Sequence, residues 1–126
     1  MRGNLSLRVF GTLSLALIAA SASAGGRYAN PPVNLLEVQA ACTKGLEAAQ
    51  KGDTAAALEQ AKVGRKLALA SYKEISTMPM EIGSSSMKKA IAALEAGNVA
   101  ESVPEFQHCK TKLDEEYEYY KKEGKF

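Results

Sequence analysis

The feature that most constrains the fold is an internal repeat at an offset of 45 residues. The segment KGDTAAALEQAKVGRKLALASY begins at Lys51, and its counterpart AGNVAESVPEFQHCKTKLDEEY begins at Ala96. In each segment a glycine is followed by Asp53 or Asn98, which is typical of a helix end followed by a new N-cap. Two copies of one helical hairpin pack most simply against each other. The repeat therefore predicts an all-α, up-down four-helix bundle.

Residues 34–122 are rich in Ala, Leu, Glu, Lys and Gln, which favour helices. Interruptions at Gly52-Asp53, at residues 76–86 and at Gly97-Asn98 divide this segment into four parts. We expect helices at about 34–51, 54–75, 82–96 and 99–122, paired as hairpins 34–75 and 82–122. Asn34 is placed to cap the first helix. Residues 25–33, with their two prolines, form an N-terminal loop, and residues 123–126 form a tail.

One face of the last predicted helix carries a seven-residue pattern of mostly apolar side chains. Its members are Val99, Val103, Phe106, Lys110, Leu113, Tyr117 and Tyr120. The repeat places Thr54, Leu58, Ala61, Arg65, Ala68, Tyr72 and Ile75 at the equivalent positions. The two cationic residues on these faces, Arg65 and Lys110, have two interpretations. Either both extend to solvent at the edge of the bundle, or they form a site for an anion or an acidic partner.

Pro104 lies inside the last predicted helix, where it removes a backbone hydrogen bond. Ser102 and Glu105 have the spacing of a capping box and could restart the helix there. We therefore expect a break or bend near residue 102.

The first 24 residues have the pattern of a cleaved secretory signal peptide. Arg2 and Arg8 give a basic start, residues 9–20 are mostly apolar, and Ala22-Ser23-Ala24 fits a cleavage site before Gly25. The apolar run is too short to span a bilayer comfortably, and no other stretch is long or apolar enough. We expect a periplasmic or secreted protein with no membrane insertion after cleavage.

Removal of the signal changes the charge of the chain. The full sequence has 16 Lys and Arg against 14 Asp and Glu. Without Arg2 and Arg8 the two signs balance, so the mature chain is formally neutral. It lacks the basic excess of a nucleic-acid-binding protein. We expect no nucleic-acid partner, and an unknown protein or small ligand is the remaining kind of partner.

Cys42 and Cys109 are the only cysteines, and an exported chain favours a disulfide between them. Cys42 stands ten residues before Gly52, about 15 Å below that end of the bundle at 1.5 Å per residue. Cys109 stands twelve residues after Gly97, about 18 Å below the same end. Because the first and last helices are neighbours, these levels permit a Cys42–Cys109 bond.

The only histidine, His108, is adjacent to Cys109. Adjacent helical residues point about 100° apart, so these two side chains cannot form a catalytic pair. A metal site would combine the cysteine thiols, if reduced, with His108 and Met87, which suits copper or zinc. His108 nevertheless lies off the core face, and it is a weak candidate ligand. We predict no enzyme, no catalytic residue and no bound cofactor.

Two stretches carry a resemblance to a known family: GDTAAALEQAKVGRKLALASYKE and MKKAIAALEAGNVAESVPEFQHCKTKL. They resemble the periplasmic small metal-binding protein (SmbP-like) family over most of residues 40–115. The resemblance implies an exported, duplicated helical hairpin that binds divalent metals, notably copper, through repeated histidines. In this chain Gln60 stands where the motif has a histidine, and Arg65 and Leu67 follow where others would occur. The chain is thus similar to a histidine-poor member.

Two functional classes remain open from the sequence. The first is an exported, non-enzymatic helical bundle that acts as a binding or interaction module. The second is a low-capacity binder of copper or another divalent metal, as the family resemblance implies.

Overall fold

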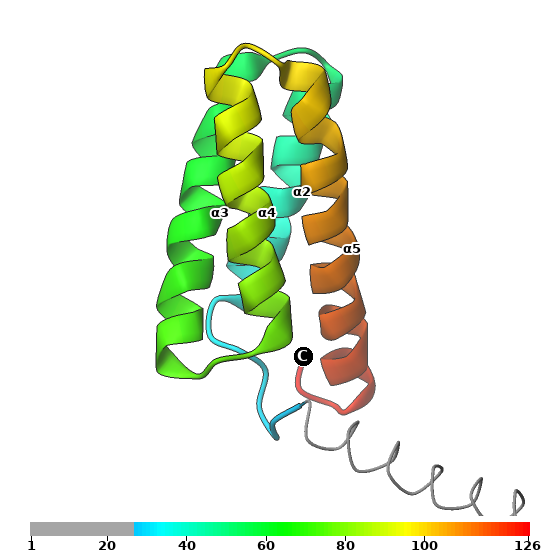
Figure 1. Ribbon diagram of the computed structural model, residues 1–126. Helices are drawn as coiled ribbons and strands as arrows, with labels where there is room; N and C mark the ends of the chain where they lie inside the picture. The colour runs from blue at the N-terminus through cyan, green and yellow to red at the C-terminus, as the bar shows by residue number, and fades with distance from the viewer. Residues whose placement is uncertain (1–26) are drawn as a thin grey trace, which may run out of the picture.

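The computed structural model describes residues 27–126, and the predicted signal peptide, residues 1–24, lies outside them. This part of the chain is an up-down bundle of four helices with no strands, which confirms the predicted fold class (Figure 1). Each helix packs against two neighbours, and the last helix closes the bundle against the first. The helices are α2 (Leu35–Gln50), α3 (Thr54–Glu74), α4 (Met78–Glu95) and α5 (Val99–Lys122).

The two turns at one end of the bundle have the same backbone geometry, 45 residues apart. Gly52 and Gly97 have positive φ angles of 77° and 81°, which glycine adopts at low cost. Each glycine amide donates to the carbonyl three residues earlier, and the next amide donates to the carbonyl five residues earlier. Asp53 then caps α3 by accepting a hydrogen bond from the Ala56 amide, as predicted. Asn98 stands at the N-cap of α5, as predicted, but its side chain makes no capping hydrogen bond.

The third helix begins earlier than expected, at Met78 rather than residue 82. Pro79 lies in the first turn, where a helix does not need the missing amide, and so it starts the helix instead of blocking it. The following serines are helical, and the Ser84 hydroxyl donates a hydrogen bond to the Glu81 carbonyl. The connection between α3 and α4 is therefore only residues 75–77.

The buried rows of α3 and α5 also follow the repeat. In α3 the row is Ala57, Ala61, Gly64, Ala68 and Ser71. In α5 it is Ser102, Phe106, Cys109, Leu113, Glu116 and Tyr120. Each α3 position matches the α5 position 45 residues later. The buried positions of the two hairpins therefore correspond at the same offset of 45 residues as the sequence repeat.

The predicted faces are correct at Phe106, Leu113 and Tyr120 and at Ala61 and Ala68. Their remaining members lie at the edge of the bundle or outside it. The seven-residue pattern therefore marks the correct side of each helix, but most of its positions lie beside the buried row. That row also includes small and polar residues such as Gly64, Ser71 and Ser102, which let neighbouring helices pack closely.

Pro104 does not break α5, which runs continuously from Val99 to Lys122, so the predicted break near residue 102 is wrong. Ser102 does not cap a new helix, because its hydroxyl donates to the Val99 carbonyl at 2.7 Å. One missing hydrogen bond near the start of a long, well-packed helix is too small a loss to end it.

Residues 27–34, which we call the N-terminal strap, run across the end of the bundle where α3 ends and α4 begins (Figure 1). The Tyr120 hydroxyl donates to the Tyr28 carbonyl at 2.7 Å. Burial, and next the charge of Glu116, raise the pKa of Tyr120, so this phenol stays protonated and able to donate. At the other end of the strap, Asn34 stands at the N-cap of α2, but its side chain makes no capping bond, contrary to expectation. Its side-chain nitrogen (Nδ2) donates instead to the Leu67 carbonyl at 3.2 Å. Both ends of the strap are thus fixed to the bundle.

Candidate functional site

Cys42 of α2 and Cys109 of α5 are fully buried and lie at disulfide distance, with Cα atoms 5.7 Å apart. This is the pairing that the helix register predicted. A thiolate is the form of cysteine that binds metal or attacks a substrate, so the bonded pair offers neither chemistry. The cysteines therefore belong to the core rather than to a reactive site.

His108 points away from the core, unlike Cys109 beside it. It lies beside a shallow groove of about 370 Å³ between α4 and α5, together with Met78, Glu81 and Lys89. Within residues 27–126, no group of three or more His, Cys, Asp or Glu side chains is placed to hold a metal ion. The predicted metal set of cysteine thiols, His108 and Met87 is not brought together, because the cysteines pair in the core and His108 faces outward.

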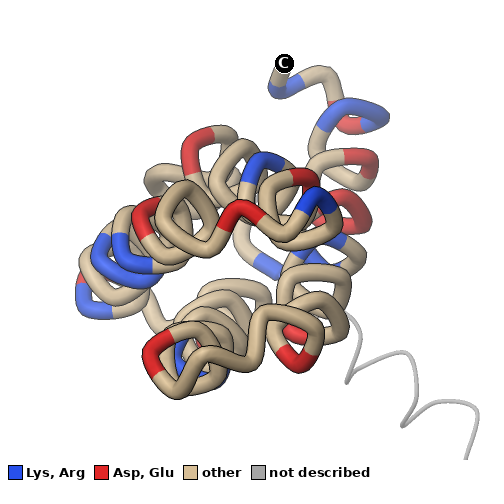
Figure 2. The backbone as a smooth tube through the Cα atoms, turned by 90° about the horizontal axis from the view of Figure 1, so that it is seen from above, with Lys and Arg blue, Asp and Glu red and all other residues tan. Residues whose placement is uncertain are grey.

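The two cationic residues on the predicted apolar faces lie at the edge of the bundle. Arg65 and Lys110 are both half-buried, which agrees with the edge interpretation. The Lys110 ammonium pairs with the Asp114 carboxylate on the same helix at 2.8 Å. Basic and acidic positions are mixed over the bundle rather than separated into two faces (Figure 2).

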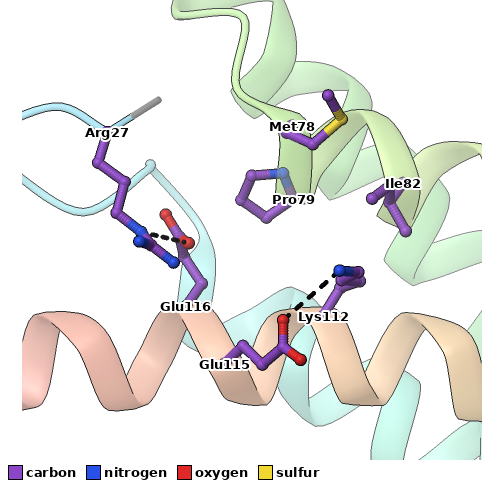
Figure 3. A pocket seen from close by; sticks show the side chains of 7 residues that line it. All are labelled: Arg27, Met78, Pro79, Ile82, Lys112, Glu115 and Glu116. Carbon is purple, nitrogen blue, oxygen red and sulfur yellow. Dashed lines mark hydrogen bonds and ion pairs between the residues drawn. The ribbon is translucent and has the colours of Figure 1, made fainter. Parts of the chain in front are cut away.

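One cleft of about 240 Å³ lies where the strap meets α4 and α5 (Figure 3). Its charged side chains pair with each other: Arg27 with Glu116 at 3.2 Å, and Lys112 with Glu115 at 3.5 Å. The Arg27 guanidinium also lies 4.2 Å from the centre of the Tyr119 ring. Each charged side chain that lines this cleft therefore already has a partner within the protein. This cleft therefore fixes the strap, and its charged groups are already matched.

A second cleft, which we call the strap pocket, has a volume of about 250 Å³. It lies between the strap and the junction of α3 with α4. Its walls are mostly apolar, and the side chains of Tyr28, Val33 and Ile75 are each about half exposed. Its lining residues are Tyr28, Ala29, Asn30, Pro31, Pro32, Val33, Ser71, Glu74, Ile75 and Thr77.

Two buried hydroxyls distinguish the strap pocket from the other clefts. Ser71 is 2% exposed and Thr77 is 8% exposed, and both line the pocket. Their hydroxyl oxygens are closed to water and make no hydrogen bond within the described chain. A buried hydroxyl without a partner costs about 1–3 kcal/mol. Such groups are rare in folded proteins, so each one calls for a structural or functional explanation.

The local structure explains why Thr77 is left without a partner. Thr77 stands at the N-cap of α4, where a threonine oxygen normally accepts a hydrogen bond from one of the first helical amides. Pro79 has no amide hydrogen, which removes one of these donors. The hydroxyl makes no capping bond at all.

The strap pocket is not predictable from the sequence pattern, because its walls come from the N-terminal loop and from the connection between two helices. One signal was present in the repeat. Ser71 is equivalent to Glu116, so a polar residue recurs on the buried row of both hairpins. Glu116 is paired with Arg27, whereas Ser71 has no partner.

The described residues thus form a small, all-α bundle with a disulfide-bonded core, and among its clefts the strap pocket is the one lined by the unpartnered hydroxyl residues Ser71 and Thr77. None of the described helices has the length and apolar character needed to cross a membrane. Comparisons of the chain with protein-family models, with curated proteins and with solved structures found no match. The resemblance to the SmbP-like family therefore stays a prediction from the sequence.

Proposed function

We propose that this protein is an exported, non-enzymatic helical-bundle module that binds a small ligand in the strap pocket. One observation carries the proposal: Ser71 and Thr77 line a mostly apolar pocket, and the hydroxyl of each is buried without a hydrogen-bond partner. Binding sites for small molecules commonly combine apolar walls with a few polar groups that fix orientation.

Export is supported by the predicted signal peptide, residues 1–24, and by the cysteine pair. A bond between Cys42 and Cys109 persists in an oxidising compartment such as the periplasm or the cell exterior. The bundle supplies a rigid support for the pocket, since both ends of the strap are fixed to it. The site needs no catalytic group to perform this role.

The test is a titration of the isotope-labelled mature chain, residues 25–126, with benzyl alcohol. Binding is monitored by the NMR chemical shifts of the backbone amides. A ligand of this size binds with roughly millimolar affinity, given the limits on binding energy per atom. We expect saturable shifts confined to the strap and to residues 71–77.

Two matched tryptophan variants check the location. Val33 and Leu36 are similarly exposed, at 49% and 45%, but only Val33 lines the strap pocket. We expect Val33→Trp to weaken binding by tenfold or more, because the indole occupies the pocket, and Leu36→Trp to leave it unchanged. Shifts that are not saturable, or that are equal in both variants, would refute the proposed site.

A further inference from the structure

We infer that the strap pocket selects a neutral, ring-sized molecule with one group that both donates and accepts a hydrogen bond. Alcohols, phenols and primary amides meet this description, whereas carboxylates and pure hydrocarbons do not. The inference rests on the proposed function and goes beyond it by naming the class of ligand.

The volume of the pocket sets the size of the ligand. An apolar cavity of about 150 Å³ is enough for benzene, and pockets for drug-sized molecules begin near 300 Å³. At about 250 Å³, the strap pocket lies between these values. It therefore has room for a single ring with a short substituent.

The two hydroxyls set the polar group. Each hydroxyl can donate one hydrogen bond and accept others, so Ser71 and Thr77 together offer both functions. The pocket also lies where α3 ends and α4 begins, at Ile75 and Thr77. Carbonyls are left free at a helix C-terminus and amides at an N-terminus. A ligand group that both donates and accepts suits these surroundings better than one with a single function.

The charges around the pocket disfavour an acid. Glu74 is the charged side chain in the lining, and no lysine or arginine is among the lining residues. The Lys125 ammonium donates to the side-chain oxygen (Oδ1) of Asn30 at 3.5 Å, but Lys125 does not line the pocket. A carboxylate would lose hydration there, lack a cation to pair with, and be repelled by Glu74.

Access to the hydroxyls requires a small local opening of the pocket, because both oxygens are closed to water in the structure. Residues 28–33 of the strap form one wall of this pocket, so we place the opening there. The strap is a loop with few hydrogen bonds between its ends, as expected of a segment that can move locally. The amides of residues 28–30 and of Val33 should therefore show the largest shifts on binding.

The test compares three probes of the same ring size: benzyl alcohol, toluene and benzoate. Each is titrated against the mature wild-type chain, residues 25–126, by amide NMR shifts. One hydrogen bond is worth about 1 kcal/mol, or about fivefold in affinity. We expect benzyl alcohol to bind at least fivefold tighter than toluene and at least tenfold tighter than benzoate.

Hydroxyl-deletion variants assign the preference to the two side chains. Thr77→Val keeps the shape of the side chain, and Ser71→Ala provides an independent second variant. We expect each to reduce the advantage of benzyl alcohol over toluene about fivefold. Ser84→Ala is the control, because its hydroxyl donates to the Glu81 carbonyl and does not line the pocket. It should leave the preference unchanged.

The outcomes separate this inference from the proposed function. Equal binding of benzyl alcohol and toluene at the pocket, or tighter binding of benzoate, would overturn the ligand class and leave the binding site standing. A preference that survives in both hydroxyl variants would also overturn it. Absence of saturable binding by all three probes would overturn both proposals.

Discussion

Replacement of Gly45 by alanine should destabilise the bundle, although alanine is the better helix former. A Cβ atom at Gly45 would overlap Cε1 of the Phe106 ring and lie 2.5 Å from Cδ1 and 2.8 Å from Cζ. The ring is fully buried, so it cannot move aside without disturbing α2 and α5. Overpacking of this kind costs about 1–3 kcal/mol, and we expect the upper end here.

The matched control is Gly83→Ala in α4. The nearest atom to a Cβ at this position is Cγ1 of Val38 at 3.5 Å, an ordinary contact. This variant should gain about 1 kcal/mol from helix propensity alone. The same gain partly offsets the clash at Gly45, which leaves a net loss of about 2 kcal/mol.

The assay is thermal and urea unfolding followed by circular dichroism. For a domain of this size, 1 kcal/mol corresponds to about 4–8 °C in Tm. Gly45→Ala should lower Tm by roughly 10 °C, and Gly83→Ala should raise it by about 5 °C. The double variant Gly45→Ala/Phe106→Leu should show a favourable coupling of about 1 kcal/mol or more. If Gly45→Ala matched or exceeded the wild type in stability, the close contact described here would be wrong.

Two further predictions concern the cysteine pair and the tyrosine that holds the strap. The wild type should have no free thiols, and replacing Cys42 and Cys109 by alanine should cost up to about 4 kcal/mol in urea unfolding, because the bond closes a loop of 67 residues. Two reactive thiols in the unfolded, unreduced protein would contradict the pairing. Burial, with the charge of Glu116, raises the pKa of Tyr120 in the folded protein above its ordinary 10.0. The protonated phenol therefore contributes its full share of folding stability below pH 10, and this share is lost as the pH rises through the folded pKa. Stability measured across that range should fall less steeply in Tyr120→Phe than in the wild type, and identical slopes would refute the assignment.

The architecture was largely predictable because it depends on signals carried by the sequence itself. Glycines at Gly52 and Gly97 mark helix ends, and helix formers fill the intervals. The offset of 45 residues then fixes which helices are equivalent. The levels of Cys42 and Cys109 followed from the rise per residue alone, and the structure places the two at disulfide distance.

The errors came from competition between local and tertiary effects. Pro79 and Pro104 suggested interruptions, but one lies in a helix's first turn and the other is outweighed by packing. The predicted face of α3 includes Arg65, which lies at the edge of the bundle, and omits Gly64, which is buried and lets the helices approach. The strap pocket depends on where a loop folds back over the bundle, and no local sequence pattern specifies that.

The most direct test of the account is the unfolding free energy of Thr77→Val without ligand. In the free protein the Thr77 hydroxyl is buried and has no hydrogen-bond partner within the described chain. Because valine has the same shape and no hydroxyl, the variant should be more stable than the wild type by about 1 kcal/mol in urea unfolding. A loss of 1 kcal/mol or more would mean that the hydroxyl already has a partner in the free protein, and it would contradict the account.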